Sequence, residues 1–307
     1  MKKAVHILVF ILLYIGAQGQ VGNNWTFGHY MGFNFSTEPP QMIYSNLKPS
    51  TRDWDRYDDT LYYFGSVSGF GASISYCNGD LALYGNTEVV KNSKHEELDT
   101  TTIPVSGAKV HLLFDSRSSG LSNRVLIFKA PNEDSVYFYY TPHHKDTHSY
   151  ASIDMTLKKG RGSAGGWDNL TKLNGPARGS NANTWARHAN GVDYWLIIKD
   201  RNKKFYTYLV TSLGISPTPI VSSLLEFNVT YGVDLAYMQL KTSHNNDKLA
   251  LSGVNVETSA PNSTYLLDFD NATGQISNPQ PVLQYADHPY HMTVALEFSP
   301  NDSLLYV

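Results

Sequence analysis

Short runs of alternating apolar and polar residues, separated by polar turns, fill most of this chain. Five times an Asn-led polar turn is followed by a run of apolar and aromatic residues, at 78–84, 132–138, 190–196, 246–251 and 301–307. The leading Asn residues lie 54, 58, 56 and 55 positions apart (132 − 78, 190 − 132, 246 − 190 and 301 − 246). A nearly fixed period of this size is typical of a stacked or radial array of one structural unit.

Each period predicts a strand, a tight turn, a second strand, a longer loop and at least one further strand. Residues 72–76 alternate, turn at Asn78-Gly79-Asp80 and resume alternation at 81–84. Asn-Gly between two alternating runs predicts a β-hairpin whose two turn residues both have positive φ, and Asn190-Gly191 repeats this signal.

A second element recurs further along each period. The segments 206–216 and 265–277 are alternating strands closed by a Gly turn, and 150–160 is a degraded copy of the same element. No apolar stripe with helical spacing continues through the chain after its N-terminal segment, so the pattern favours strands throughout.

A unit of about 55 residues with three or four strands matches a β-propeller blade, which is a four-stranded antiparallel sheet. Sandwich domains would repeat at about twice this spacing and β-helices at a much shorter one. We therefore predict an all-β fold, a β-propeller over residues 20–307. Equivalent strands should carry Leu81, Val136, Tyr194, Leu249 and Leu304. Because the fifth copy stops one strand after Asn301, we expect an incomplete ring that continues in a longer protein.

The N-terminus predicts an export signal. A positively charged start at 1–3 precedes a segment, 4–15, that is apolar apart from His6, and Ala17 and Gly19 are small residues suited to signal-peptidase cleavage. The alternative is a membrane anchor, but the apolar segment is shorter than the roughly 20 residues that span a bilayer. We expect residues 1–19 to be removed, a mature chain without a membrane span, and a secreted or cell-surface location.

Composition narrows the classes of function. Aromatic residues make up 13% of the chain and charged residues only 17%, a balance that favours half-buried strands. A net charge of −3 gives no basic surface for nucleic acid. Cys77 is the single cysteine, so no intramolecular disulfide can form, and its place in an alternating run predicts a small buried hydrophobe.

Histidines are the first candidates for chemistry. Two groups have spacings that a metal ion could use: His143, His144 and His148, and His288 with His291. No carboxylate stands at a diagnostic offset and no HExxH motif is present, so we favour loop histidines on a propeller face. His188 is expected to form hydrogen bonds between blades.

Acidic residues give two further candidates. Asp53, Asp55, Asp58 and Asp59 cluster, but the Gly and terminal Glu of a calcium loop are missing, and we favour a solvated loop. Asp268 and Asp270 alternate with apolar residues and share one face of a strand. They are either a catalytic pair or part of a polar outer face.

The remaining motifs carry no defined chemistry. The Gly-rich segment 160–166 lacks a following GK[ST], which favours a mobile loop, and no G-x-S-x-G elbow is present. Asn-x-Ser/Thr sequons, compatible with surface turns, begin at Asn24, Asn34, Asn169, Asn228, Asn262, Asn271 and Asn301. The sequence thus predicts no catalytic residue, no metal ligand and no cofactor, and it leaves the binding residues unknown.

Several segments resemble the N-terminal region of large bacterial surface proteins that carry a type-B sorting domain of the type IX secretion system and are associated with gliding motility. The segments are 24–28, 32–35, 72–75, 78–81, 187–195, 267–270 with Thr273-Gly274, and 296–307. The last segment is also similar to the FSPDG…LYV strand pair of WD40-like and lactonase-like propellers, with Asn301 in place of the usual Asp and Asp302 in place of the usual Gly. The resemblance implies a secreted propeller without a defined active site.

Two classes of function follow. The first is a non-enzymatic binding or adhesion module that contacts glycans or a surface protein, in which Trp54, Trp167 and Trp185 would stack on sugars or be buried between blades. The second is a propeller hydrolase, lactonase-like or a glycosidase, suggested by analogy of fold alone. The remaining hypothesis is that the chain is a purely structural spacer.

Overall fold

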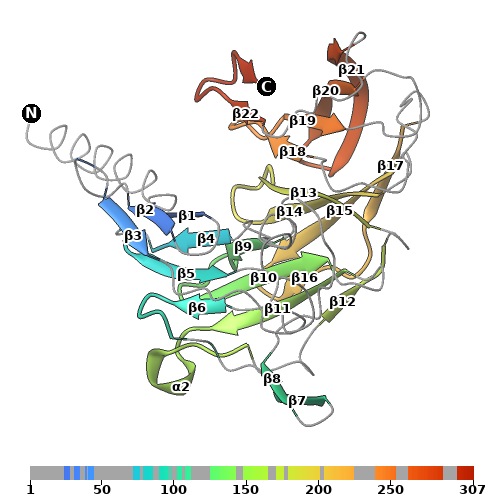
Figure 1. The fold of residues 1–307 in the computed structure, drawn as a ribbon. Coiled ribbons are helices and arrows are strands. Elements are labelled where there is room, and N and C mark those ends of the chain that lie inside the picture. Colours follow the sequence, from blue (N-terminus) through green and yellow to red (C-terminus); the bar gives the residue numbers. More distant parts are fainter. Residues whose placement is uncertain are drawn as a thin grey trace, which may run out of the picture. The chain divides into compact units, whose positions relative to one another are not determined.

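The computed structural model describes an almost entirely β-structured chain (Figure 1). The described residues are 24–27, 31–34, 39, 41–44, 72–76, 79–85, 90–96, 98, 102–105, 108–111, 125–142, 148–164, 171–175, 179–200, 204–224, 239–253, 262–285 and 296–307. They belong to two compact units, Met1–Leu113 with Asp154–Asp168 and Phe114–Ile153 with Asn169–Val307. The predicted all-β class is confirmed.

In the first unit, the described residues form three antiparallel sheets. They are formed by β1 (Asn24–Phe27), β2 (Met31–Asn34) and β3 (Gln41–Tyr44); by β4 (Ala72–Ser75), β5 (Leu81–Gly85) and β6 (Val90–Asn92); and by β7 (Thr102–Val105) with β8 (Ala108–His111). The described residues of this unit also include α2 (Leu157–Gly160), a single turn in which Lys158 and Lys159 have positive φ.

In the part of the second unit that the structure describes, there are four successive antiparallel sheets. Their strands, in chain order, are β9 (Leu126–Lys129), β10 (Val136–Pro142), β11 (His148–Asp154) and β12 (Thr171–Leu173); β13 (Gly179–Arg187), β14 (Tyr194–Asp200), β15 (Lys204–Thr211), β16 (Gly214–Ile215) and β17 (Ile220–Ser223); β18 (Gln239–Thr242), β19 (Lys248–Gly253), β20 (Asn262–Asp270) and β21 (Gln275–Tyr285); and β22 (Glu297–Phe298) with β23 (Leu305–Tyr306). Within the three larger sheets, strands that follow one another in sequence pair side by side. This order is that of a β-propeller blade.

The second sheet of this unit fills its fourth strand position with two short strands. β16 pairs with the last two residues of β15, and β17 pairs with its first four. Pro217 and Pro219 lie between β16 and β17, where proline cannot donate to a ladder. The five strands therefore form a blade of four positions with an interrupted outer strand.

The Asn-led turns occupy one structural position. Each joins the first and second described strands of its sheet, β4 to β5, β9 to β10, β13 to β14, β18 to β19 and β22 to β23. The residues predicted to be equivalent lie at the start of the second strand or next to it: Leu81, Val136, Tyr194, Leu249 and Leu304. The structure confirms the repeat.

The predicted type of turn is wrong for Asn190-Gly191, whereas Asn78 lies outside the described residues. In the turn before β14, Gly191 N donates to His188 O and Gly191 has φ of +74°, whereas Asn190 is not among the residues with positive φ. Asn246 and Asp302 hold the same position, with φ of +59° and +56°. The turn is thus a longer one closed by a single left-handed residue. Asn and Asp tolerate this conformation best after Gly, which explains Asp302 in the place of the usual Gly.

The second recurring element is confirmed in two copies and differs in the third. β15 turns at Gly214 into β16, and β20 turns at Gly274 into β21. After β11 the chain instead forms α2, and Asp154 then bridges to Ser163. Residues 162–164 are buried there, so this part of the Gly-rich segment is packed, contrary to the expected mobile loop.

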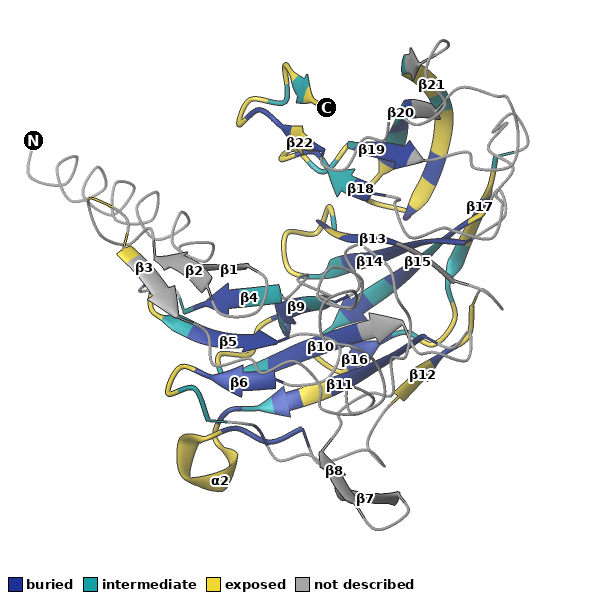
Figure 2. Ribbon diagram, in the orientation of Figure 1, coloured by how far each residue is buried: buried dark blue, intermediate teal, exposed yellow. Residues whose placement is uncertain are grey.

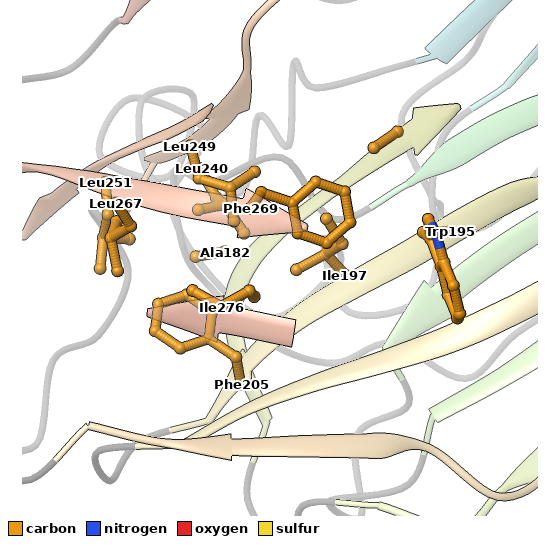
Figure 3. Close-up of a cluster of buried hydrophobic side chains, with 11 residues drawn as sticks. Ala182, Trp195, Ile197, Phe205, Leu240, Leu249, Leu251, Leu267, Phe269 and Ile276 are labelled. Atoms are coloured by element: carbon orange, nitrogen blue, oxygen red, sulfur yellow. The ribbon is translucent and has the colours of Figure 1, made fainter. Parts of the chain in front are cut away.

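Alternation along the strands places apolar side chains between consecutive sheets of the second unit. Figure 2 shows the buried residues along these strands in dark blue. One cluster joins the β9–β12 sheet to the β13–β17 sheet through residues such as Phe138, Tyr140, Leu196 and Tyr208. A second joins the β13–β17 sheet to the β18–β21 sheet, and Figure 3 shows Ile197 and Phe205 together with side chains of the following sheet. Burying each large apolar side chain contributes about 1.5–3 kcal/mol, so these faces hold neighbouring sheets together.

The outer strand β21 is built to resist further pairing. It is largely exposed, and its register with β20 shifts twice, once on each side of Pro281. Asn278 has φ of +51° and is followed by Pro279. Bulges and prolines on an edge strand hinder its pairing with another chain.

Candidate binding surface

An exposed tryptophan marks the surface at the end of strand β13. Trp185 is 40% exposed, although the residues on either side of it, Thr184 and Ala186, are buried. The alternation of the strand explains this arrangement, because successive side chains point to opposite faces of a sheet. Of the three tryptophans singled out from the sequence, Trp185 is the one that falls within the described residues, and it is partly exposed rather than buried between blades.

Trp185 is held by an aromatic neighbour on the next strand. The ring of Tyr194 meets the Trp185 ring edge to face, with centroids 5.5 Å apart and an interplanar angle of 86°. Tyr194 is itself half-buried and packs on the apolar cluster that joins the β9–β12 and β13–β17 sheets. Edge-to-face pairs of this kind contribute about 0.5–1.5 kcal/mol beyond their buried area. The indole is therefore fixed from behind while part of it faces solvent.

An arginine shares this face. Arg187 follows Trp185 by two residues in β13 and lies directly opposite Tyr194 in β14. Side chains two apart in a strand, and those of directly opposed residues, lie on the same face of the sheet. Arg187 is exposed. Among the described residues, no carboxylate forms an ion pair with its guanidinium.

The backbone beneath this surface is tied to the following sheet at two points. Thr242 Oγ1 donates to Trp185 O at 2.9 Å, and Arg187 N donates to Asn246 Oδ1 at 2.8 Å. Asn246 occupies the left-handed position of its own turn, so the residue that closes one turn also anchors the previous strand. We call Trp185, Arg187 and Tyr194 the aromatic–arginine surface.

The same kind of tie links the next pair of turns. Asp302 accepts hydrogen bonds from His244 N at 2.8 Å and from Asn245 N at 2.7 Å. Hydrogen bonds to its carboxylate, opposed by burial, leave the pKa of Asp302 below its usual value. In the last two copies, the left-handed residue of the turn thus accepts hydrogen bonds from the backbone of the preceding sheet.

The structure gives His148 a structural place in the core. His148 is 2% exposed, and its Nδ1 lies 2.6 Å from Tyr140 Oη, with the two rings stacked at an interplanar angle of 3°. Burial lowers the pKa of His148 to about 4, so the ring is neutral at pH 7. Its predicted companions His143 and His144 lie outside the described residues, as do His288 and His291. The expectation of a loop histidine is wrong for His148.

The two strand aspartates do share a face, and each has a structural partner. Asp268 pairs with Lys248 and also accepts from Asn278 Nδ2. Asp270 closes the turn into β21 by accepting from Thr273 Oγ1 at 2.7 Å. Hydrogen bonds from Lys248 and from Thr273 respectively lower the pKa values of Asp268 and Asp270. A polar outer face accounts for both, whereas a proton-donating carboxylic acid would need a raised pKa.

His188 supports its own turn. Its Nδ1 accepts from Asn190 N at 2.9 Å, and its ring stacks on Trp195 with centroids 5.1 Å apart. The bond between sheets is made instead by the next residue, since Ala189 N and Trp195 Nε1 both donate to Asn271 O. The role of His188 is structural, as expected, but its bond stays within one turn.

A buried lysine that the sequence did not single out lies at the end of β14. Lys199 is fully buried, its Nζ donates to Asp200 O at 2.9 Å, and it lies 3.7 Å from Asp200 Oδ1. Its Nζ also lies 5.5 Å from the centroid of the Phe205 ring. Burial lowers the pKa of Lys199 to about 8, although Asp200 opposes this effect. Nothing in the local sequence separates this lysine from the exposed ones.

The described residues contain no group of three or more His, Cys, Asp or Glu side chains that could hold a metal ion. They also contain no helix long and apolar enough to cross a membrane. The aspartate cluster 53–59, Cys77, Trp54 and Trp167 all lie outside the part of the chain that the structure describes.

Comparison with known proteins reveals distant similarity of structure. No protein-family model matches the chain, and no curated protein matches its sequence. Among solved structures, it is similar to a protein from Bacteroides uniformis provisionally assigned as a 6-phosphogluconolactonase, with 12% identity, a TM-score of 0.41, and coverage of 90% of this chain and 69% of that one. It is also similar to TolB from Acinetobacter baumannii (12% identity, TM-score 0.27, coverage 81% and 53%). An exo-β-1,3-galactanase from Phanerochaete chrysosporium is similar at 13% identity, a TM-score of 0.34, and coverage of 70% and 48%.

The class of protein rests on the chain's own sheets. Successive blade-like antiparallel sheets, repeating with the Asn-led turns, define an all-β protein of the β-propeller type. The identities and TM-scores of the similar structures are too low to carry over an active site or an activity from any of them.

Proposed function

We propose that this chain is a non-enzymatic β-propeller binding module of a secreted or cell-surface protein, and that it contacts a glycan or a surface protein. The export signal expected at 1–19 supports the location, and so does the resemblance to surface proteins of the type IX secretion system. Gliding motility and adhesion are the settings in which such a module would act.

One observation carries the proposal. Trp185 exposes part of its indole at a site where Tyr194 and two hydrogen bonds to the neighbouring sheet hold it in place. Rigid aromatic side chains offer a large contact area at a low entropic cost, and they are enriched among the residues that dominate binding. A partly exposed tryptophan held in this way is better suited to contacting a ligand than to packing in the hydrophobic core.

The chemical groups that the structure describes favour binding over hydrolysis. His148 is buried and neutral, Asp268 is paired with Lys248, and Asp270 closes a turn. Each of the three already has a structural partner within the fold. A lactonase-like or glycosidase activity would have to draw on residues outside this set.

The experiment compares the wild-type chain with Trp185→Ala on a glycan array and in pull-downs from the surface of the producing cell. Loss of a central aromatic anchor should cost about 2 kcal/mol or more, which corresponds to at least about 30-fold weaker binding. Leu213→Ala is the matched control, because Leu213 is 97% exposed in the turn between β15 and β16, and strand β14 separates β15 from β13.

Three results are decisive. Binding that Trp185→Ala weakens and Leu213→Ala leaves unchanged supports the proposal. Binding that resists both substitutions moves the site elsewhere. If neither assay yields a ligand while a lactone or glycoside screen shows turnover, the chain is a hydrolase and the proposal fails.

A further inference from the structure

We propose that the aromatic–arginine surface recognises acidic saccharides, with the sugar ring on Trp185 and the sugar carboxylate on Arg187. This inference rests on the proposed binding function and specifies its ligand class. It depends on three features that the register of β13 and β14 brings together: an exposed indole, an aromatic support and a guanidinium free of described ion pairs.

The indole fits one part of such a ligand. A pyranose ring has an apolar face of C–H groups and a rim of hydroxyls, so it can lie on an aromatic plane while its rim stays hydrated. Tyr194 meets Trp185 edge to face and is anchored in the apolar cluster beneath it, which limits movement of the indole. A fixed platform reduces the entropy lost on binding a ligand.

The guanidinium fits the other part. Arg187 is the next residue on the same face of the strand, one pleat repeat of roughly 7 Å from Trp185. A carboxylate on a ring carbon stands within the reach of a long side chain at that spacing. Arginine binds carboxylates through two parallel hydrogen bonds, which are stronger than bonds between neutral groups.

Local charge favours an acidic partner. The whole chain has a net charge of −3, so it does not attract anions in general. The positive charge of Arg187 is not compensated by a described carboxylate, in contrast to Lys248 and Lys241, which pair with Asp268 and Glu297. An anion that binds at Arg187 supplies the missing counter-charge.

Two hydrogen bonds to the following sheet fix the backbone positions from which Trp185 and Arg187 extend. Trp185 O and Arg187 N, which flank Ala186, are bound to Thr242 and Asn246 of the following sheet. Because the β-bulge of β13 lies between Gly179 and Asn183, the register at Trp185 and Arg187 is regular. The two side chains are therefore presented at a constant spacing, as recognition of a sugar ring and its carboxylate requires.

The test uses an array of uronic- and sialic-acid oligosaccharides, each paired with its carboxyl-reduced form. The wild-type chain should bind the acidic member of a pair about tenfold more tightly than the reduced member. Arg187→Gln should remove this preference, and Trp185→Ala should weaken binding to both members. Leu213→Ala should change neither. Raising the ionic strength should weaken binding to the acidic member only.

Each other outcome has a distinct meaning. Equal binding of acidic and reduced glycans that still depends on Trp185 overturns the inference and leaves the proposed function standing. Binding of an acidic peptide or a surface protein, with no glycan bound, also overturns the inference, since the partner then belongs to another class. If no ligand is bound in any format, both the inference and the proposed function fail.

Discussion

Lowering the pH from 7 to 4 should destabilise the second unit through His148. The ring is buried against Tyr140, and its pKa falls from the ordinary 6.5 to about 4. Between these two values the unfolded chain binds a proton at this position and the folded chain does not, so stability falls as the pH is lowered. A difference of about 2.5 pH units, at about 1.4 kcal/mol each, gives a loss of about 3 kcal/mol.

The pH range in which His148 affects stability differs from the range in which the aspartates do. The pKa values of Asp154, Asp268, Asp270 and Asp302 are all lowered from 3.8. Their stabilising contributions are therefore lost only as the pH falls below about 4. A loss of stability between pH 6.5 and 4 that disappears when this ring is replaced is therefore attributable to His148.

The assay is urea denaturation of the folded chain at several pH values, followed by fluorescence. The double variant Tyr140→Phe with His148→Phe removes the titrating ring together with its hydrogen-bond partner, so no buried hydroxyl is left unpaired. Its free energy of unfolding should change by about 3 kcal/mol less than that of the wild type between pH 6.5 and 4. Tyr140→Phe alone is the control, because it removes the same hydrogen bond and keeps the imidazole. If the double variant and the wild type show the same pH dependence over this range, the burial argument is refuted.

Two further predictions follow from the structure and the sequence. Lys199 has a folded pKa of about 8 against an ordinary 10.5, so stability should rise by about 3 kcal/mol as the pH increases from 8 to 10.5. The variant Lys199→Met should not show this rise. The measurement is the hydrogen-exchange protection of the β14 amides between pH 8 and 10.5, and an equal increase in the wild type and in Lys199→Met would contradict the prediction. N-terminal sequencing of the exported protein should begin at Gln20, because Ala17 and Gly19 suit signal-peptidase cleavage; a chain that still begins at Met1 would rule out removal of 1–19.

The sequence by itself determined the repeat and the positions of its turns. A residue that must adopt positive φ is preferably Gly, Asn or Asp, and this local rule is visible at Gly79, Gly191, Asn246 and Asp302, in four of the five copies. Alternation within each strand likewise reports which side chains share a face, as it did for Asp268 and Asp270. Both signals act over a few residues, so they can be read without knowing what packs against them.

Only the tertiary structure decided the type of turn and which ionisable side chains are buried. His148 and Lys199 lose water because side chains from other strands enclose them, and nothing within a few residues of either position signals that enclosure. Asn246 holds the strand of Arg187 across 59 positions of sequence. The sequence pointed to Trp185 as one of three tryptophans, but register and contacts between sheets bring it together with Tyr194 and Arg187, because strand pairing joins residues that are distant along the chain.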